Sequence, residues 1–253
     1  MIRAARLGDL EQIAALIRSS FDPDLHDYMI FAQHGINHYL AVLISMPLTG
    51  PDRALLVEAD DTGQVRAFAD FSTATSGDAF LSYICVSPRT QKRGYATQLI
   101  EYFLKSRAIA SLSLDVFADN QRALALYKKL GFEGIGEISW LVNNMPAPEA
   151  NSSLRLSNAL EASAVHARYG FCRYEAEWRG SALSLGRIGR RTIRCFAREK
   201  FADTAFLSSV RALFPEAEHA LFISDPSECT RSDDTFLLQK SLRMKLSTSR
   251  TGG

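Results

Sequence analysis

Residues 79–108, AFLSYICVSPRTQKRGYATQLIEYFLKSRA, contain the stretch that decides the fold. The pattern predicts a strand over 79–86, a short basic loop, and a helix from about Ala96 to Ala108. The first N–H groups of a helix have no partners inside the helix, and they carry a partial positive charge. Gly94 lets an anion approach this backbone closely, and Lys92 and Arg93 add two positive side chains. The loop is therefore predicted to bind a diphosphate.

Two further patterns accompany this loop in a fixed order along the chain. The preceding strand follows L-x-x-I-x-V-x-P at residues 81–88, and the loop itself follows Q-x-x-G-x-A at residues 91–96. Residues 120–132, NQRALALYKKLGF, follow N-x-x-A-x-x-L-Y-x-K-x-G-F. Taken alone, Gly94 would be interpreted as a turn glycine beside solvated charges. The three patterns together resemble the GNAT (Gcn5-related N-acetyltransferase) family, over about residues 1–145.

The resemblance implies an α+β fold, with a mixed, mostly antiparallel sheet flanked by helices. It also implies acetyl-CoA as cosubstrate, in a cleft between the strands at residues 79–86 and 112–116. Main-chain groups of Ile84, Cys85 and Val86 would pair with the pantetheine arm and polarise the thioester carbonyl. Asn120 would form a hydrogen bond with the cofactor. The pyrophosphate would be held by Gln91, Lys92, Arg93, Gly94, Tyr95, Ala96 and Thr97. Ala96 departs mildly from the family pattern, in which a second glycine is commoner.

Tyr127 is the candidate general acid and a further cofactor contact, by the same resemblance. The reaction would be aminolysis of a thioester, in which the leaving thiol has a pKa of about 8.5 and a tyrosine one of about 10. Tyrosine can therefore donate a proton or a hydrogen bond to the departing sulfur. The alternative interpretation of Tyr127 is a packed aromatic residue beside Phe132.

The general base is less sharply indicated. An alkyl amine has a pKa of about 10.4, so a group must accept its proton or the site must select the neutral form. The resemblance implies a Glu or Asp on the third or fourth strand as the base, and Asp70 is the candidate. Asp70 interrupts an apolar alternating strand, where a carboxylate is costly unless it faces a cleft or solvent. Asp78 is a second candidate, with Tyr83 or His26 as relays. The alternative interpretation of Asp70 is a solvated strand face.

Cysteines and histidines give no metal or redox motif. The four cysteines are scattered without a C-x-x-C pair, which favours free thiols. Cys85 is interpreted as a small strand residue lining the cleft rather than as a nucleophile. His34 and His38 lie four residues apart on a predicted helix, but no H-E-x-x-H pattern is present, so no metal site is expected. In the GNAT family the region after the first helix usually walls the acceptor site, so the resemblance implies that His26, Tyr28, Phe31, His34 and His38 form an aromatic, partly polar acceptor pocket.

Other elements are predicted outward from the central stretch. We expect a strand at 2–5, a helix opened by Asp9, a helical stretch over 25–44, a hairpin at 54–58 and 65–72, and a helix at 120–130. Beyond residue 153 the pattern predicts helices at 154–168 and 203–213, and strands at 173–178, 183–197, 220–224 and 236–244. Residues 143–153 are rich in Pro, Asn and Ser and are the best linker candidate.

Composition supports a globular protein of two parts. The chain has 253 residues, 47% of them hydrophobic, and a formal net charge of +1. Such a balance provides no strong field for nucleic acid or an anionic membrane. The opening residues lack a signal-peptide h-region, and no apolar run approaches the roughly 20 residues that span a bilayer. We therefore expect a cytoplasmic protein. Residues 1–150 carry 13 Lys and Arg against 17 Asp and Glu, whereas residues 151–253 carry 16 against 11.

The predicted domains are a GNAT acetyltransferase domain at 1–145 and a smaller C-terminal α/β domain at 151–253. Residues 170–171 repeat the Gly-Phe pair of residues 131–132, which suggests a degenerate, partial repeat of the same fold. That alignment places His166 at the position of Tyr127, and no Q-x-x-G-x-A precedes it. The second domain would complete the acceptor site or form a homodimer interface.

The predicted function is transfer of an acetyl group from acetyl-CoA to a primary amine on a small molecule or peptide. A non-catalytic CoA-binding or regulatory module on the same fold is the first alternative. The second is an RNA-associated protein that uses the basic residues of the C-terminal half, although nucleic acid is disfavoured because only Phe196 and Phe201 interleave with them. No membrane partner is expected.

Overall fold

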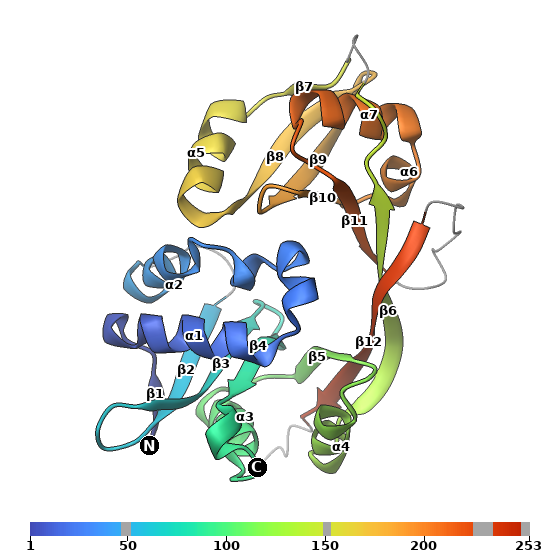
Figure 1. The fold of residues 1–253 in the computed structure, drawn as a ribbon. Coiled ribbons are helices and arrows are strands. Elements are labelled where there is room, and N and C mark those ends of the chain that lie inside the picture. The colour runs from blue at the N-terminus through green and yellow to red at the C-terminus, as the bar shows by residue number, and fades with distance from the viewer. Residues whose placement is uncertain (47–51, 149–152, 225–234, 249–253) are drawn as a thin grey trace. The chain divides into compact units, whose positions relative to one another are not determined.

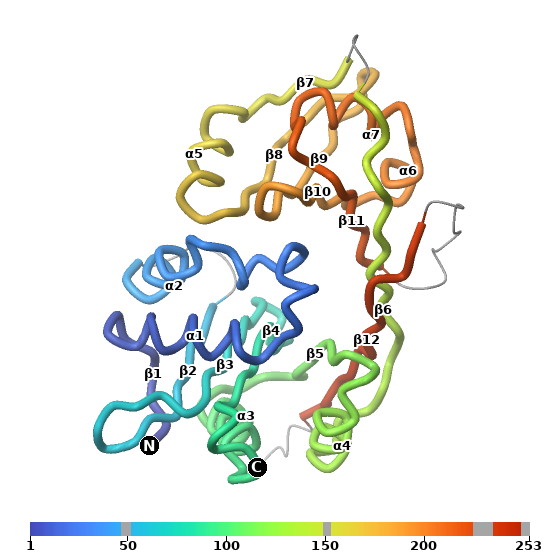
Figure 2. The backbone as a smooth tube through the Cα atoms, in the orientation of Figure 1, coloured from blue at the N-terminus to red at the C-terminus, as the bar shows by residue number. Residues whose placement is uncertain are grey.

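The computed structural model describes residues 1–46, 52–148, 153–224 and 235–248. The chain divides into two compact units, whose elements are labelled in Figure 1. Unit 1 comprises Met1–Asp22, Tyr39–Glu137 and Ser241–Gly253, and unit 2 comprises Pro23–His38 and Ile138–Lys240. Figure 2 follows the chain from α1 through residues 23–38 into α2. The units are therefore interleaved in sequence.

Unit 1 is a mixed, mostly antiparallel sheet with helices on both faces. Its strands follow the order β1-β2-β3-β4-β5-β12, and only β4 and β5 are parallel. The strands are β1 (Ile2–Ala4), β2 (Asp52–Ala59), β3 (Val65–Thr73), β4 (Asp78–Val86), β5 (Ser111–Phe117) and β12 (Thr235–Ser247). The helices are α1 (Leu10–Ser20), α2 (Ile36–Ser45), α3 (Tyr95–Ser106) and α4 (Gln121–Lys129).

The main core of unit 1 lies between the sheet and helices α3 and α4. Helix α3 is amphipathic, and its apolar residues Leu99, Ile100 and Phe103 have no exposed surface. Phe103 stacks on Phe71 of β3, with ring centroids 4.0 Å apart. Helix α1 contacts β3 and β4 and buries Ile13. The helix after the basic loop is thus fixed against the sheet, and its N-terminus is held in place.

Unit 2 has a sheet of the order β6-β11-β10-β9-β8-β7. Its strands are β6 (Glu133–Asn144), β7 (Arg155–Leu156), β8 (Phe171–Trp178), β9 (Ser181–Ile188), β10 (Thr192–Cys195) and β11 (His219–Ser224). Its helices are α5 (Ala159–Tyr169), α6 (Arg198–Phe201) and α7 (Thr204–Leu213). The core is aromatic, and it includes the edge-to-face pair Trp178 and Phe206.

Unit 2 repeats the topology of unit 1. In each unit a short edge strand pairs antiparallel with the next strand, a helix lies between them in sequence, and two further antiparallel strands follow. A helical crossover then leads to a parallel strand, β5 in one unit and β11 in the other. Helix α5 therefore corresponds to α1. The predicted alignment, which matched residues 159–171 to the helix and Gly-Phe pair at 120–132, is wrong.

The units differ from the predicted domain boundaries. Residues 23–38 belong to unit 2, whereas Ser241–Ser247 of β12 pairs with β5 in unit 1. Predicted strand 183–197 is a hairpin of β9 and β10, and predicted helix 25–44 is two 3₁₀ segments followed by α2. The middle of the predicted linker, residues 149–152, lies outside the described residues, and so does Cys229. Cys85, Cys172 and Cys195 are buried free thiols, as expected.

Candidate active site

Strand β4 separates from β5 halfway along its length. The two strands pair from Asp78 with Ser111 to Leu81 with Leu114. A register irregularity follows, because Phe71 of β3 faces Leu81 whereas Asp70 faces Tyr83. Within the described residues, the pairing of β4 with β5 ends at Leu81 and Leu114, so the two strands do not pair along Ile84–Val86. This edge can bind an extended ligand.

The loop between β4 and α3 has the backbone of an anion site. Lys92 and Gly94 both have left-handed conformations, with φ of 64° and 79°. Gly94 is the N-cap of α3 and has no side chain with which to cap the first turn. A Cβ there would have space, since the nearest atom is Gln98 Nε2 at 3.7 Å, but it would force a residue other than glycine into the left-handed region. Successive N–H groups in such a loop form a concavity for anions.

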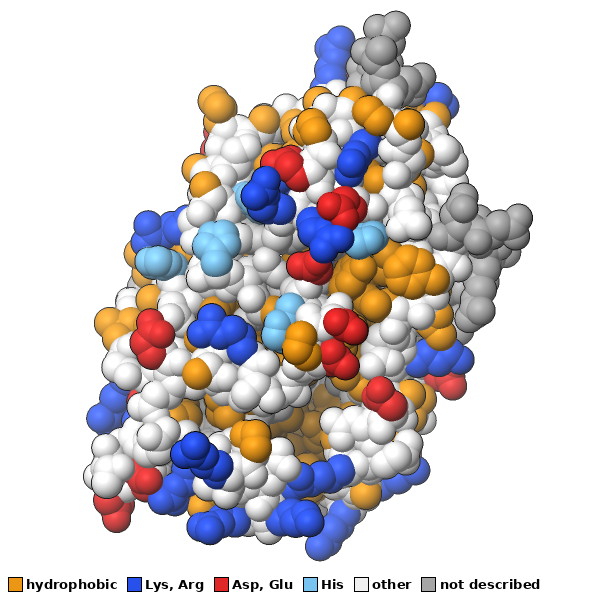
Figure 3. Space-filling model, viewed as in Figure 1, with side chains coloured by type: hydrophobic (Ala, Val, Ile, Leu, Met, Phe, Trp, Pro, Cys, Tyr) orange, Lys and Arg blue, Asp and Glu red, His pale blue; other side chains and the backbone are white. Residues whose placement is uncertain are grey.

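One contact joins this loop to α4, and α4 itself begins with a side-chain cap. The Arg122 guanidinium of α4 donates a hydrogen bond to the Gln91 amide oxygen. The Asn120 side chain caps α4 by accepting from the Ala123 N–H at 3.1 Å, which leaves its amide N–H groups as donors. Figure 3 shows a hollow on this face of unit 1 between α1 and α4, with hydrophobic side chains in its depth and Lys and Arg side chains along its lower edge.

Tyr127 is buried where the two strands part. Burial raises the pKa of its hydroxyl far above the ordinary value, and the neighbouring Cys85 thiol contributes to the shift. Tyr127 also contacts Phe132, with ring centroids 5.6 Å apart. The packed-aromatic and proton-donor interpretations are therefore compatible, since the ring packs while the hydroxyl remains protonated. Burial raises the pKa of Cys85 to about 12, against a hydrogen bond with Ser20 that lowers it, so this residue is a neutral thiol and no nucleophile.

Aromatic side chains line the parting of β4 and β5. Phe21, at the end of α1, contacts Tyr83 of β4 and Phe117 of β5 edge to face, at centroid distances of 5.8 and 6.2 Å. Phe21 therefore bridges the two strands on the face that α1 covers. This contact was missed in the sequence because nothing local relates residue 21 to either strand.

The two candidate bases have different surroundings. Asp70 has no exposed surface, and both its oxygens accept from the Arg53 guanidinium, one of them at 3.2 Å. Burial raises the pKa of Asp70 and Arg53 opposes the shift. Asp70 therefore lies neither on a solvent-exposed strand face nor in an open cleft. Asp78 lies at the paired end of β4, away from the parting, and accepts from Ser111 at 2.6 Å and Ser76 at 2.9 Å, which lower its pKa.

The predicted histidine pocket is not formed as predicted. His34 lies in a turn before α2, and its ring contacts the Ala167 carbonyl at 3.4 Å, whereas Phe31 is a core residue. The helical spacing of His34 and His38 is therefore lost. Among the residues described, no group of three or more His, Cys, Asp or Glu side chains is placed to hold a metal ion. No helix in the same part of the chain is long and apolar enough to cross a membrane.

The corresponding loop of unit 2 lacks the anion-site features. Residues 196–203 contain no glycine, and the Asp203 carboxylate caps α7 by accepting from the Phe206 N–H at 3.0 Å. Strand β10 is paired with β11 along its whole length, from Thr192 to Cys195, so the two strands do not part. The side chain at the helix N-terminus is itself an anion. This loop is therefore closed to a diphosphate.

The basic residues of unit 2 are largely engaged within the unit. Arg187 forms an ion pair with Glu216 at 3.5 Å, and Arg191 bridges Asp27 and Glu218. Further cations lie over aromatic rings, and these pairs are Arg194 with Phe196 and Lys200 with Phe206. This arrangement weakens the RNA-binding alternative, which needs a stripe of available cations.

Comparison with known proteins gives a family for the N-terminal part. Residues 10–132 match the sequence model of the Acetyltransferase (GNAT) family. The [Ribosomal protein bS18]-alanine N-acetyltransferase of Escherichia coli strain K12 is 36% identical over 84 residues, which are 32% of this chain and 56% of that protein. The same enzyme of Salmonella typhimurium is 38% identical over 81 residues. The chain thus matches only about half the length of these curated relatives.

Solved structures match the whole chain. A tandem GNAT protein from the clavulanic acid biosynthesis pathway has a TM-score of 0.66 at 12% identity and covers 98% of both chains. A GCN5-related N-acetyltransferase from Sphaerobacter thermophilus has a TM-score of 0.62 at 14% identity and covers 98% of this chain and 95% of its own. At these identities the likeness concerns the fold. It agrees with the repeated topology of unit 2, and the predicted fold class is confirmed.

Proposed function

Residues 10–132 are an acetyltransferase domain of the GNAT family, and on this basis we propose that the protein transfers an acetyl group from acetyl-CoA to a primary amine. The single observation that carries the proposal is a juxtaposition within unit 1. The part of β4 that does not pair with β5 leads into the left-handed turn at Gly94, and the buried Tyr127 lies near Cys85 of that same part of β4.

The residues present fit the cosubstrate at both ends of its length. A diphosphate fits the turn, because the N-terminus of α3 offers N–H groups and the loop adds Lys92 and Arg93. An amide-containing arm fits the edge of Ile84–Val86 that does not pair with β5, because an extended strand edge carries main-chain donors and acceptors. Asn120 lies at the N-terminus of α4 with donors to spare. Bound acetyl-CoA would supply an acetyl group activated as a thioester.

In the proposed reaction the amine nitrogen attacks the thioester carbonyl carbon. A C–N bond forms, the C–S bond breaks, and one proton leaves the nitrogen while one is needed at the sulfur. In this proposal a main-chain N–H of Ile84–Val86 would stabilise the charge that develops on the carbonyl oxygen. Tyr127 would donate to the sulfur. Its raised pKa keeps it protonated at any pH near neutrality, so it needs no separate group to protonate it first.

Asp70 is kept as the proposed base, but its role is constrained by Arg53. An amine proton must reach a carboxylate that already accepts from a guanidinium on both oxygens. The alternative within the same proposal is a positioning role, in which the ion pair fixes β3 opposite Tyr83. The primary amine itself is proposed at the level of class. A peptide with an N-terminal alanine is the first to test, because the matched relatives are by name N-acetyltransferases of an alanine of ribosomal protein bS18.

The test is release of free thiol from acetyl-CoA in the presence of an acceptor. We would compare a peptide with an N-terminal alanine, a polyamine and a free amino acid. With an accepted amine, Tyr127→Phe is expected to lower kcat by about 10²-fold or more, since proton donation by a placed side chain contributes that much. Its affinity for acetyl-CoA should stay close to that of the wild type, because only the hydroxyl is removed.

Two results would contradict this proposal. If the wild type binds acetyl-CoA but acetylates none of these amine classes, the non-catalytic CoA-binding alternative gains support. If Tyr127→Phe keeps the full kcat, the assignment of the acid is wrong. Phe132→Leu serves as the control, because it disturbs the packing of the Tyr127 ring without removing the hydroxyl.

A further inference from the structure

Arg66 of β3 contacts the diphosphate loop at both of its ends. At the beginning of the loop, the Ser87 N–H donates to the main-chain carbonyl of Arg66 at 2.8 Å. At the end, Arg66 Nη1 donates to the Tyr95 hydroxyl at 3.2 Å, and the guanidinium lies 5.9 Å from the centre of the Tyr95 ring. Tyr95 is the first residue of α3. One residue thus spans the whole segment from Ser87 to Tyr95.

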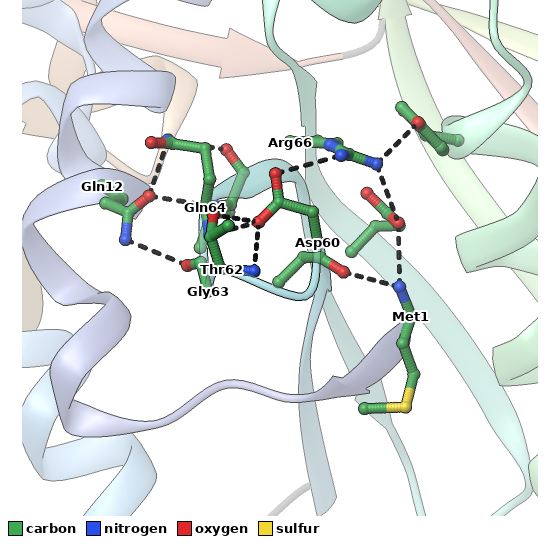
Figure 4. A network of polar contacts seen from close by, with 11 residues as sticks. Met1, Gln12, Asp60, Thr62, Gly63, Gln64 and Arg66 are labelled. Carbon is green, nitrogen blue, oxygen red and sulfur yellow. Dashed lines mark hydrogen bonds and ion pairs between the residues drawn. The ribbon is translucent and has the colours of Figure 1, made fainter.

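The Arg66 side chain is itself held by carboxylates. Its Nη2 donates to Asp60 Oδ2 at 3.0 Å, and Nη1 lies 4.0 Å from the buried Glu58 carboxylate (Figure 4). Hydrogen bonds from Thr62 and Gln64 lower the pKa of Asp60 to about 2, with a smaller effect of Arg66. Asp60 is therefore charged throughout the neutral range.

The turn that carries Asp60 is anchored to helix α1. Gln12 of α1 accepts from the Val65 N–H at 2.9 Å and from Gln64 Nε2 at 2.7 Å (Figure 4). Asp60 Oδ1 accepts from the N–H groups of Thr62 and Gln64 inside the turn, at 3.0 and 2.9 Å. The turn that holds the Arg66 guanidinium is therefore itself fixed to α1.

We propose that Arg66 is a positioning residue for the diphosphate-binding loop, and that the Arg66–Tyr95 contact fixes the N-terminus of α3 for the anion. This inference rests on the proposed function. Arg66 needs no contact with the cosubstrate, because it acts through Tyr95 and Ser87. Lys92 is left-handed, a conformation that is unfavourable for a residue other than glycine, so fixing the two ends of the loop helps to hold this geometry before an anion binds.

The experiment compares two ligands that differ in the diphosphate. Acetyl-CoA contains it, whereas S-acetylpantetheine has the same thioester arm without it. For Arg66→Met we expect the Kd for acetyl-CoA to rise about tenfold, which corresponds to roughly 1.4 kcal/mol. For Tyr95→Phe, which removes one hydroxyl and keeps the main chain, we expect a rise of about threefold. The affinity for S-acetylpantetheine should be unchanged in both variants.

Arg107→Met is the matched control. Arg107 also lies over an aromatic ring of α3, Phe103 at 6.0 Å, and also pairs with a carboxylate, Asp52, but it is at the other end of the helix. This variant should bind both ligands as the wild type does. Tyr95→Phe retains the test if Arg66→Met does not fold.

Three outcomes would overturn the inference. Unchanged acetyl-CoA affinity in both variants would show that the Arg66–Tyr95 contact is dispensable for binding. An equal loss of affinity for both ligands would show that the substitution disturbs the structure generally and does not act through the diphosphate-binding loop. Failure of the wild type to bind acetyl-CoA would overturn the proposed function and this inference with it, and that result is separate from the first two, in which the wild type binds.

Discussion

Asp70 is a buried carboxylate whose nearest charge is on the neighbouring strand. Its side chain has no exposed surface, and the Arg53 guanidinium contacts both oxygens. A buried ion pair adds little to stability as a whole, but loss of one partner leaves the other charge without compensation. The pair therefore constrains unit 1 even if Asp70 also takes a proton from the acceptor.

We predict that Asp70→Asn lowers the free energy of unfolding by about 3 kcal/mol, because Arg53 is left partly buried without its counter-charge. Urea denaturation of the wild type and of Asp70→Asn measures the difference in the free energy of unfolding. Asp78→Asn is the control, since Asp78 is exposed and its partners are two serine hydroxyls. A change of less than about 1 kcal/mol in Asp70→Asn, the range of a surface pair, would show that the ion pair is not structurally important.

The partner of Asp70 could not be predicted from the sequence. An apolar strand interrupted by an Asp indicated an exceptional carboxylate, but it did not indicate whether a cleft, solvent or a cation compensates it. Arg53 faces Ser72 in the register of β2 and β3, so its side chain reaches Asp70 diagonally across the pair. That relation depends on the hairpin register, which local patterns do not fix. Arg66 and Tyr95 are similarly brought together only by the packing of β3 against the loop.

Helices α3 and α7 hold equivalent places in the two units but begin differently. Helix α3 begins at Gly94 without a capping side chain, and α7 begins at Asp203, whose carboxylate accepts from the Phe206 N–H. The first N-terminus has no side-chain cap, whereas the second is capped by the chain itself. On our proposal, this difference at one position separates the diphosphate site from a structural element.

We predict that Asp203→Ala lowers the stability of unit 2 by about 1 kcal/mol, the usual cost of a lost N-cap. Hydrogen exchange of the α7 amides measures the effect locally. Ser208→Ala, on the same helix but away from its end, is the control. A null effect in Asp203→Ala would show that the cap is not needed. Binding of a second acetyl-CoA to this variant would contradict our view that the closed strand pair also excludes the ligand.

The glycines in the sequence predicted where helices end, but they were misleading about which helices of the two units are equivalent. Gly131 and Gly170 both have positive φ, 88° and 79°, at the ends of α4 and α5. A glycine in the left-handed conformation is a general helix terminator, so the repeated Gly-Phe pair did not identify equivalent helices. The strand pairing did, and that pairing is a long-range property.

The predicted helix over 25–44 failed for a tertiary reason. Gly35 lies in the middle of it, and a Cβ at that position would be 2.2 Å from the Arg168 carbonyl oxygen. Close packing of this segment against the end of α5 has therefore replaced a continuous helix, and the pattern of apolar residues contained no sign of it. The loop over 87–95, in contrast, was predicted well because its strand, glycine and helix are adjacent in sequence.

At the scale of the whole molecule, unit 2 has kept the fold, but among the described residues the features of the proposed cosubstrate site are found in unit 1. Unit 1 has the parted strands, the left-handed turn and the buried tyrosine, whereas unit 2 has a closed strand pair and an anionic cap. The two units also exchange segments, since β12 completes the sheet of unit 1 and residues 23–38 are part of unit 2. The predicted cut near residue 150 would therefore not separate them, and we expect the full chain to be the unit of function.

The most direct test of this account is a calorimetric titration of the full chain with acetyl-CoA. We predict one molecule bound per chain, with a Kd of roughly micromolar order. Gly94→Glu should abolish binding, because it places a side chain and a negative charge in the left-handed turn. Gly180→Glu should bind as the wild type does, since Gly180 also has a positive φ but lies in open space in the hairpin of unit 2. Absence of binding to the wild type, two molecules per chain, or undiminished binding to Gly94→Glu would contradict the account.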